Sequence, residues 1–135
     1  MRIRRFEPAD EGAVIALWRR CGLVVPRNDP ATDIALKMRW QPELFFVGEV
    51  DGRIVATVMA GYEGHRGWIN YLAVDPDAQR RGLGRLLMSV AEDALRATGC
   101  PKINLQVRSS NQAVVEFYRH LGYVVDDVIG LGKRL

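Results

Sequence analysis

The chain has 135 residues, of which 48% are hydrophobic and 26% charged, and it carries a formal net charge of +3 at pH 7. This length fits one domain, which we expect to span residues 1–135, and the composition excludes disordered and membrane-embedded chains. No apolar stretch approaches the roughly 20 residues of a membrane span, and the N-terminus lacks the apolar segment of a secretion signal. The sequence therefore predicts a cytoplasmic protein without a membrane partner.

The cysteines and histidines form no metal-binding pattern. Cys21 and Cys100 lack CxxC spacing, and His65 and His120 stand alone, so we expect no metal and no disulfide. Basic residues are spread along the chain, which argues against a nucleic-acid partner. An anionic small ligand accounts for the positive charge equally well.

The first half of the chain predicts helices followed by a hairpin. Apolar spacing indicates, in chain order, a strand over 2–6, a helix over 10–21, and a second helix from Asp29 toward Trp40. The dipeptide Asp51-Gly52 then separates two apolar runs. This dipeptide is typical of a type I′ turn, so we expect two antiparallel strands around it.

The second half predicts alternating strands and helices. We expect a strand over 68–74, a helix from Leu83 to Gly99, a strand over 102–107, a helix over 111–122, and one or two strands in the tail from Tyr123. A right-handed crossover through the first helix would make its two flanking strands parallel. The predicted fold is a mixed α/β sheet with helices on both faces.

The turn before Leu83 has the features of an anion site. Gly82 and Gly84 let the backbone approach a ligand, and the free N–H groups of the helix point outward at the positive end of its dipole. Arg80, Arg81 and Arg85 add positive charge, which favours a phosphate or pyrophosphate. The alternative is a plain strand-to-helix connection with surface arginines.

Two common phosphate motifs do not fit this turn. The P-loop requires Lys-Ser or Lys-Thr after its last glycine, where this chain has Arg85-Leu86. The dinucleotide fingerprint requires a third glycine at the position of Leu87.

The run QRRGLG, from Gln79 to Gly84, resembles the Q/R-x-x-G-x-G/A motif of the GNAT N-acetyltransferases. Farther along, Asn111, Tyr118 and Gly122 lie in a stretch similar to the family pattern N-x-x-A-x-x-x-Y-x-x-x-G-F. The stretches GHRGWINYLAV and GLGKRL are similar to the small bacterial YpeA-type subgroup. The resemblance covers the second half closely and the first half in element order.

This resemblance implies the GNAT fold and acetyl-CoA as co-substrate. The fold would be a mixed, mostly antiparallel sheet of six to seven strands with a splayed parallel pair, flanked by about four helices. The pantetheine arm would lie in the gap between the splayed strands. The resemblance assigns cofactor contacts to Leu72, Ala73, Val74, Gln79, Arg80, Arg81, Gly82, Leu83, Gly84, Arg85 and Asn111. Asn111 also fits an ordinary helix cap.

The implied reaction is direct acetyl transfer to a primary amine of a small molecule or protein, because no cysteine is placed as an obvious nucleophile. Tyr118 matches the tyrosine that the family places near the cofactor sulfur, although a core aromatic beside Phe117 is an alternative. Many relatives carry a carboxylate in or just before the strand WINYLAV, but this strand has none. Glu63 is the nearest candidate base and His65 a weaker one; Glu63 also fits a solvated loop charge, and a water chain is a further route for the proton.

Two other functions are compared with acetyl transfer. An acetyl-CoA-binding module without turnover is the main alternative, since the strand carboxylate is missing. A DNA-reading role for the helix over 111–122 fits poorly, because its apolar residues suggest burial. The first two helices and their loop should shape the acceptor site, but Arg27, Asp29, Asp33, Lys37 and Arg39 mix both signs. The protein is expected to be a monomer or homodimer.

Overall fold

The computed structural model describes all residues from 1 to 135, and they divide into two compact units, Met1–Leu105 and Gln106–Leu135. The strands, all in the first unit, are β1 (Arg2–Arg5), β2 (Phe45–Val50), β3 (Arg53–Tyr62), β4 (Gly67–Val74) and β5 (Ile103–Leu105). The α-helices are α1 (Glu11–Arg20), α2 (Pro30–Met38), α3 (Leu83–Ala97) and α4 (Gln112–His120), of which α4 belongs to the second unit. Short 3-10 turns cover Pro8–Asp10, Pro42–Leu44 and Pro76–Ala78.

The sheet has the order β1-β2-β3-β4-β5 and mixes two kinds of pairing. Neighbours from β1 to β4 are antiparallel, and β4 and β5 are parallel, which confirms the predicted mixed sheet. The turn between β2 and β3 has φ of 51° at Asp51 and 74° at Gly52. Positive φ at both central residues is the geometry of a type I′ turn, so the predicted hairpin is also confirmed.

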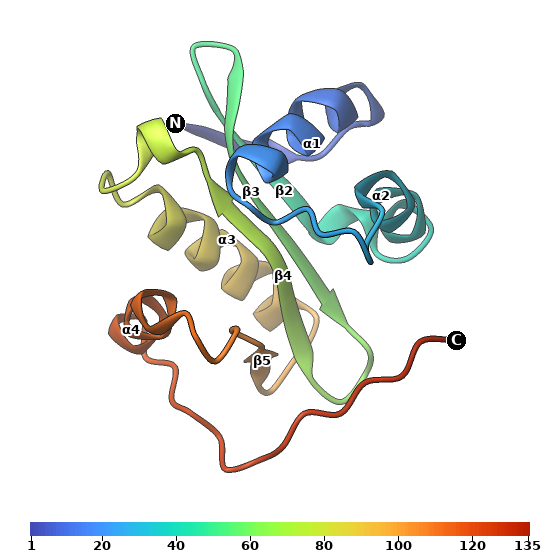
Figure 1. Cartoon of the computed structure of the whole chain (residues 1–135), viewed down its shortest axis with the longest axis vertical. Helices are drawn as coiled ribbons and strands as arrows, with labels where there is room; N and C mark the ends of the chain where they lie inside the picture. Colours follow the sequence, from blue (N-terminus) through green and yellow to red (C-terminus); the bar gives the residue numbers. More distant parts are fainter. The chain divides into compact units, whose positions relative to one another are not determined.

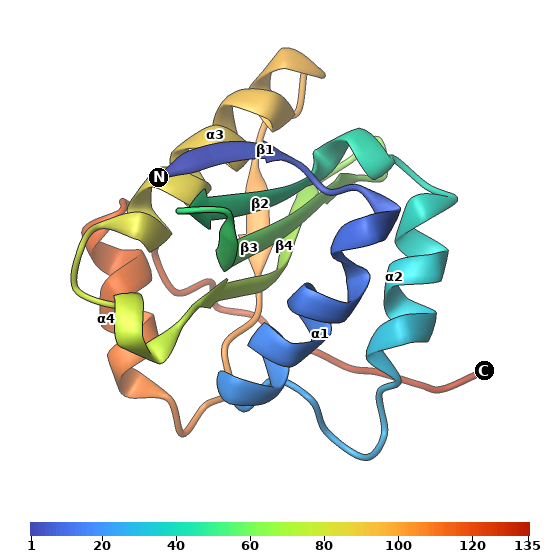
Figure 2. The same cartoon turned by 90° about the horizontal axis from the view of Figure 1, so that it is seen from above.

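Helices cover both faces of this sheet (Figures 1 and 2). Helices α1 and α2 pack together and α1 contacts β3 and β4, whereas α3 lies against the opposite face and contacts β2, β3 and β4. Trp18 and Phe45 are fully buried in the α1 layer. Helical spacing after Leu83 predicts a buried apolar face, and Leu87, Ala91 and Leu95 of α3 are indeed at 0% exposure. Leu86, which the same spacing assigns to that face, is instead 49% exposed. None of the helices combines the length and hydrophobicity that a membrane span requires.

The predicted number of strands was wrong: the sheet has five strands, not six or seven. The tail from Tyr123 to Leu135 contains no helix or strand, and Val124, Val125, Val128 and Ile129 are 70–89% exposed. These valines and the isoleucine favour strands, but a strand exists only when a neighbouring strand accepts its hydrogen bonds. Intrinsic propensity does not reveal whether such a partner is present.

A buried lysine joins α2 to the sheet. Lys37 is only 9% exposed, and its ammonium group donates to the carbonyl of Ala60 on β3. Nearby, Gln41 makes two hydrogen bonds with the backbone of Tyr62, at 2.8 and 2.9 Å. Burial lowers the pKa of Lys37, because the charged form loses its hydration.

This lysine should give stability a recognisable pH dependence. Because its folded pKa is lowered, the unfolded chain binds more protons between that pKa and roughly 10.4, the reference lysine value. Stability should therefore rise with pH across this window in the wild type, and the rise should be smaller in Lys37→Met. Urea denaturation from pH 7 to 10 measures it, with the exposed Lys133→Met as control. Parallel curves for wild type and Lys37→Met would contradict the prediction.

Candidate functional site

Strand β4 presents a free backbone edge. Its parallel pairing with β5 covers only Gly67–Ile69, opposite Ile103–Leu105, while β3 pairs with β4 as far as Val74. Residues 70–74 therefore have a neighbouring strand on one side only, over roughly 16 Å at the usual rise of a strand. An extended ligand can hydrogen-bond to such an edge as another strand would.

A β-bulge lies within this free segment. Met59 pairs with Asn70 and Thr57 with Ala73, so two steps along β3 face three steps along β4. The extra residue falls at Tyr71 and Leu72, and Tyr71 has a left-handed φ of 50°. A bulge leaves backbone groups outside the regular ladder and re-aims neighbouring side chains. The side chain of Ala73 is buried in the core, so only its backbone is available to a ligand.

The turn after β4 is held in place by Asp75. This residue is 3% exposed; it accepts from the amide of Asp77 at 3.0 Å and from Arg20 at 2.8 Å. These contacts lower the pKa of Asp75, the backbone hydrogen bond having the largest effect and Arg20 a smaller one. The carboxylate therefore stays ionised and fixes the start of the predicted anion-binding turn.

The end of this turn opens the N-terminus of α3. Gly82 is the N-cap residue with φ of 76°, and no side chain caps the helix. The first hydrogen bond at this end runs from the amide of Leu86 to Gly82 at 3.1 Å, so the amides of residues 83–85 precede it. Arg80, Arg81 and Arg85 are exposed around them. Free amides, a helix dipole and three arginines together can hold a phosphate group.

The last residue of β4 already has side-chain partners. The carbonyl of Val74 accepts from the thiol of Cys21 at 3.3 Å and from the Gln79 amide at 3.3 Å. Burial is the main cause that raises the pKa of Cys21, so its thiol is disfavoured as a thiolate nucleophile. A ligand hydrogen bond to this carbonyl would have to compete with these two donors.

The second unit contains Asn111 and Tyr118. The side chain of Asn111 accepts from the amide of Val114 at 3.3 Å, so it does cap α4. Tyr118 is 9% exposed and makes edge contacts with the rings of Phe117 and Tyr123, at centroid distances of 5.1 and 5.6 Å. Burial raises the pKa of Tyr118 to about 12, so its hydroxyl stays protonated at neutral pH.

Glu63 lies in the exposed turn between β3 and β4. Its carboxylate accepts from the amide of His65 at 2.6 Å and from the amide of Arg66. These two hydrogen bonds lower the pKa of Glu63, that from Arg66 most strongly. The turn is about four residues from the bulge, or roughly 13 Å along the strand. Glu63 thus has a structural role in its own turn.

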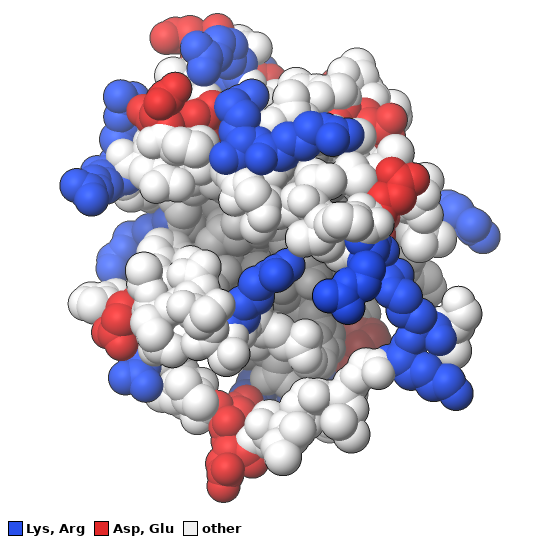
Figure 3. Space-filling model, in the orientation of Figure 1, with Lys and Arg blue, Asp and Glu red and all other residues white.

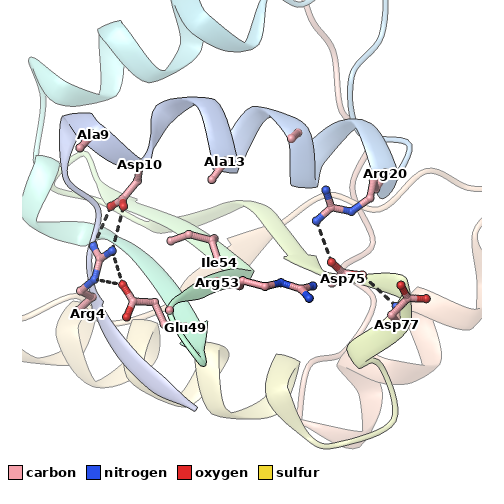
Figure 4. Close-up of a pocket in the computed structure, with 12 residues that line it drawn as sticks. Arg4, Ala9, Asp10, Ala13, Arg20, Glu49, Arg53, Ile54, Asp75 and Asp77 are labelled. Atoms are coloured by element: carbon pink, nitrogen blue, oxygen red, sulfur yellow. Dashed lines mark hydrogen bonds and ion pairs between the residues drawn. The ribbon is translucent and has the colours of Figure 1, made fainter.

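A cleft with a volume of about 520 Å³ lies elsewhere, between α1 and the β2–β3 hairpin (Figure 4). None of the predicted site residues lines it. Five of its charged side chains are paired with one another: Arg4 donates to Asp10 and Glu49, each at 2.7 Å, and Arg20 pairs with Asp75. We therefore assign the candidate site to the β4 edge and the α3 N-terminus rather than to this cleft.

The visible surface carries charges of both signs, and no metal-binding group is present in the structure. Figure 3 shows Lys and Arg side chains interspersed with acidic and uncharged ones. The structure has no group of three or more His, Cys, Asp or Glu side chains placed to hold a metal ion. Both cysteines are free.

Two residues near the bulge were not identified as a pair from the sequence. The hydroxyl of Tyr71 donates to Asp33 Oδ2 on α2 at 2.6 Å, although 38 positions separate them. Burial first, and then this hydrogen bond, raises the pKa of Tyr71. Asp33 was predicted only as one of several charges near the acceptor site. No local pattern signals the pair, because the contact depends on how α2 packs against the sheet.

The family match, the sequence relatives and the similar solved structure are all acetyltransferases. Residues 12–123 match the acetyltransferase (GNAT) family. An acetyltransferase of Pectobacterium atrosepticum is 52% identical over 135 residues, which is 100% of this chain and 96% of the relative. An uncharacterized N-acetyltransferase of Yersinia pestis is 50% identical over 135 residues, again 100% of this chain and 96% of the relative. Among solved structures, the ribosomal-protein-S18-alanine N-acetyltransferase from Escherichia coli is 28% identical and superposes with a TM-score of 0.75. The match covers 90% of this chain and 76% of the E. coli chain.

Proposed function

The chain belongs to the acetyltransferase (GNAT) family, and we propose that it transfers the acetyl group of acetyl-CoA to a primary amine of a small molecule or protein. The main support for this proposal is that the free edge of β4 is followed, after one short turn, by the uncapped N-terminus of α3. The edge suits the amide-containing pantetheine arm, and the turn suits the pyrophosphate. Both parts of the site lie in one continuous stretch of chain, residues 70–85.

The cofactor contacts follow from this placement. Backbone groups of Leu72, Ala73 and Val74 would pair with the pantetheine arm. Gln79 to Arg85 would surround the pyrophosphate with amides and arginines. Around Gly82 a Cβ atom would meet nothing within 4 Å, so there is room for a bulky anion beside the backbone. Asn111, which belongs to the second unit, is assigned by its sequence motif alone.

The chemical step is direct attack of the amine on the thioester. The nitrogen lone pair forms a bond to the carbonyl carbon, the carbon–sulfur bond breaks, and the sulfur takes a proton. We propose that Tyr118 donates this proton, on the basis of its motif; its hydroxyl holds a proton at neutral pH, because burial raises its pKa to about 12. The proton lost by the amine passes to a base or to water. The disfavoured thiolate of Cys21 supports direct transfer over an acetylated cysteine.

The identity of the base is open to a direct test with Glu63→Gln. If Glu63 takes the proton, the substitution should flatten the acidic limb of kcat/KM against pH. Its lowered pKa and its distance from the bulge instead lead us to expect superimposable profiles. Both proteins are measured with one acceptor amine whose own pKa is well above that of a carboxylate. A flattened limb would establish Glu63 as the base.

The proposed function is tested by the release of free thiol from acetyl-CoA in the presence of a panel of amines. Amine-dependent thiol release is expected. Binding of acetyl-CoA without thiol release from any amine would favour the alternative, an acetyl-CoA-binding module without turnover.

A further inference from the structure

The bulge in β4 holds Tyr71 in a costly backbone conformation. A left-handed φ of 50° is unusual for a bulky aromatic residue, and it persists only where surrounding contacts fix it. Here the ring stacks on Trp18 at a centroid distance of 3.7 Å, and the Tyr71 carbonyl accepts from the Thr57 hydroxyl at 2.8 Å. Trp18 in turn donates to that hydroxyl at 2.9 Å. Residues of two other elements, Trp18 of α1 and Thr57 of β3, therefore hold Tyr71 in one position.

The position of Tyr71 determines the position of Asp33. Its hydroxyl donates to Oδ2 of the Asp33 carboxylate at 2.6 Å, on the face of the sheet covered by α1 and α2. Asp33 is only partly buried and takes part in none of the ion pairs of the protein. Its other oxygen, Oδ1, accepts no hydrogen bond from the chain. The carboxylate is thus fixed at one oxygen and available at the other.

A purely structural contact does not require this charge. Joining α2 to the sheet through Tyr71 needs only a hydrogen-bond acceptor, which an asparagine would also supply. A carboxylate without a cationic partner, held by the side chain of a residue from the free segment of β4, is instead suited to a positively charged ligand.

The position of Asp33 relative to β4 indicates which cationic group of the acceptor would bind to it. Asp33 lies beyond the far end of the Tyr71 side chain rather than at the β4 backbone. A carboxylate in contact with the reacting nitrogen would also stabilise its ammonium form and oppose attack. Both considerations favour a second cationic group, separated from the reacting amine by a short chain.

We propose that Asp33 binds a second ammonium group of the acceptor, with Tyr71 as its positioning residue, so that the protein selects diamines over monoamines. This proposal rests on acetyl transfer as the proposed function. Leu36, one helical turn after Asp33, is 55% exposed and offers apolar surface to the carbon chain of such an acceptor.

The test compares two probes of equal length, 1,4-diaminobutane and 4-aminobutan-1-ol, binding to the protein saturated with CoA. Calorimetry should show the diamine bound about tenfold or more tightly by the wild type, as a charge-assisted hydrogen bond would give. In Asp33→Asn the two affinities should become equal. Tyr71→Phe keeps the stacked ring but frees the carboxylate, so the preference should shrink.

Asp29→Asn is the matched control variant. It removes the same charge from the same helix, while asparagine still caps α2 through the contact that Asp29 makes with the Ala31 amide at 3.2 Å. Its preference for the diamine should equal that of the wild type.

The proposal fails if the wild type does not prefer the diamine, or if Asp33→Asn keeps the preference. Thiol release from acetyl-CoA with these amines separates this result from failure of the proposed function. Turnover without diamine preference would remove only the role of Asp33. Diamine preference without turnover would instead remove acetyl transfer.

Discussion

Replacing Gly84 with aspartate should weaken acetyl-CoA binding at least about 100-fold, the loss expected when one or two charge-assisted hydrogen bonds are removed. Gly84 is the second residue of α3, where free amides and the helix dipole would meet the pyrophosphate. The new side chain places a negative charge against that anion. Aspartate near a helix N-terminus stabilises the helix, so the variant should remain folded. Calorimetry with acetyl-CoA measures the loss.

A control variant with the same added charge shows whether the effect depends on the turn or on a negative charge anywhere on α3. Ser89→Asp adds the same charge to an exposed position in the middle of α3. We expect its affinity for acetyl-CoA to be close to that of the wild type. Equal affinities for the wild type and folded Gly84→Asp would show that the turn is only a connection between β4 and α3.

Tyr118→Phe should lower kcat by roughly 10²–10⁴-fold, the usual effect of a general acid. The affinity for acetyl-CoA should change little, because the hydroxyl acts only as charge develops on sulfur. The ring remains, so the edge contacts with Phe117 and Tyr123 are kept and the variant should be stable. Steady-state kinetics and calorimetry together measure the two effects.

Tyr123→Phe is the control for this experiment, since it removes a hydroxyl from a ring that packs against Tyr118. It should retain wild-type kcat. Full activity in Tyr118→Phe would instead assign this residue to the aromatic core of the second unit.

Local patterns predicted most elements of this fold. The Asp51-Gly52 turn and the helix that begins at Leu83 were each predicted correctly, because turn chemistry and helical periodicity depend on neighbouring residues. The glycine turn was likewise readable, since it needs a strand end, two glycines and a helix start in succession. A few adjacent residues are enough to determine the conformation of such a turn.

Contacts between distant segments were not predictable in this way. The tail residues around Val124 and Ile129 have strand propensity without a strand partner, and the expected additional strands are absent. The bulge at Tyr71 depends on the pairing register with β3, and its contact with Asp33 depends on the packing of α2. The turn-capping hydrogen bonds of Glu63 were also missed, because they depend on the conformation of an exposed loop.

Direct transfer from acetyl-CoA, held by the β4 edge and the α3 turn, to an amine is tested most directly by a single turnover. Protein and acetyl-CoA in equal amounts are mixed with an amine that supports thiol release. Mass spectrometry follows the amine and the protein at early times. We predict that acetylated amine and free CoA appear together, one for one, while the protein keeps its mass. An acetylated protein at early times, or free CoA without acetylated amine, would contradict the account.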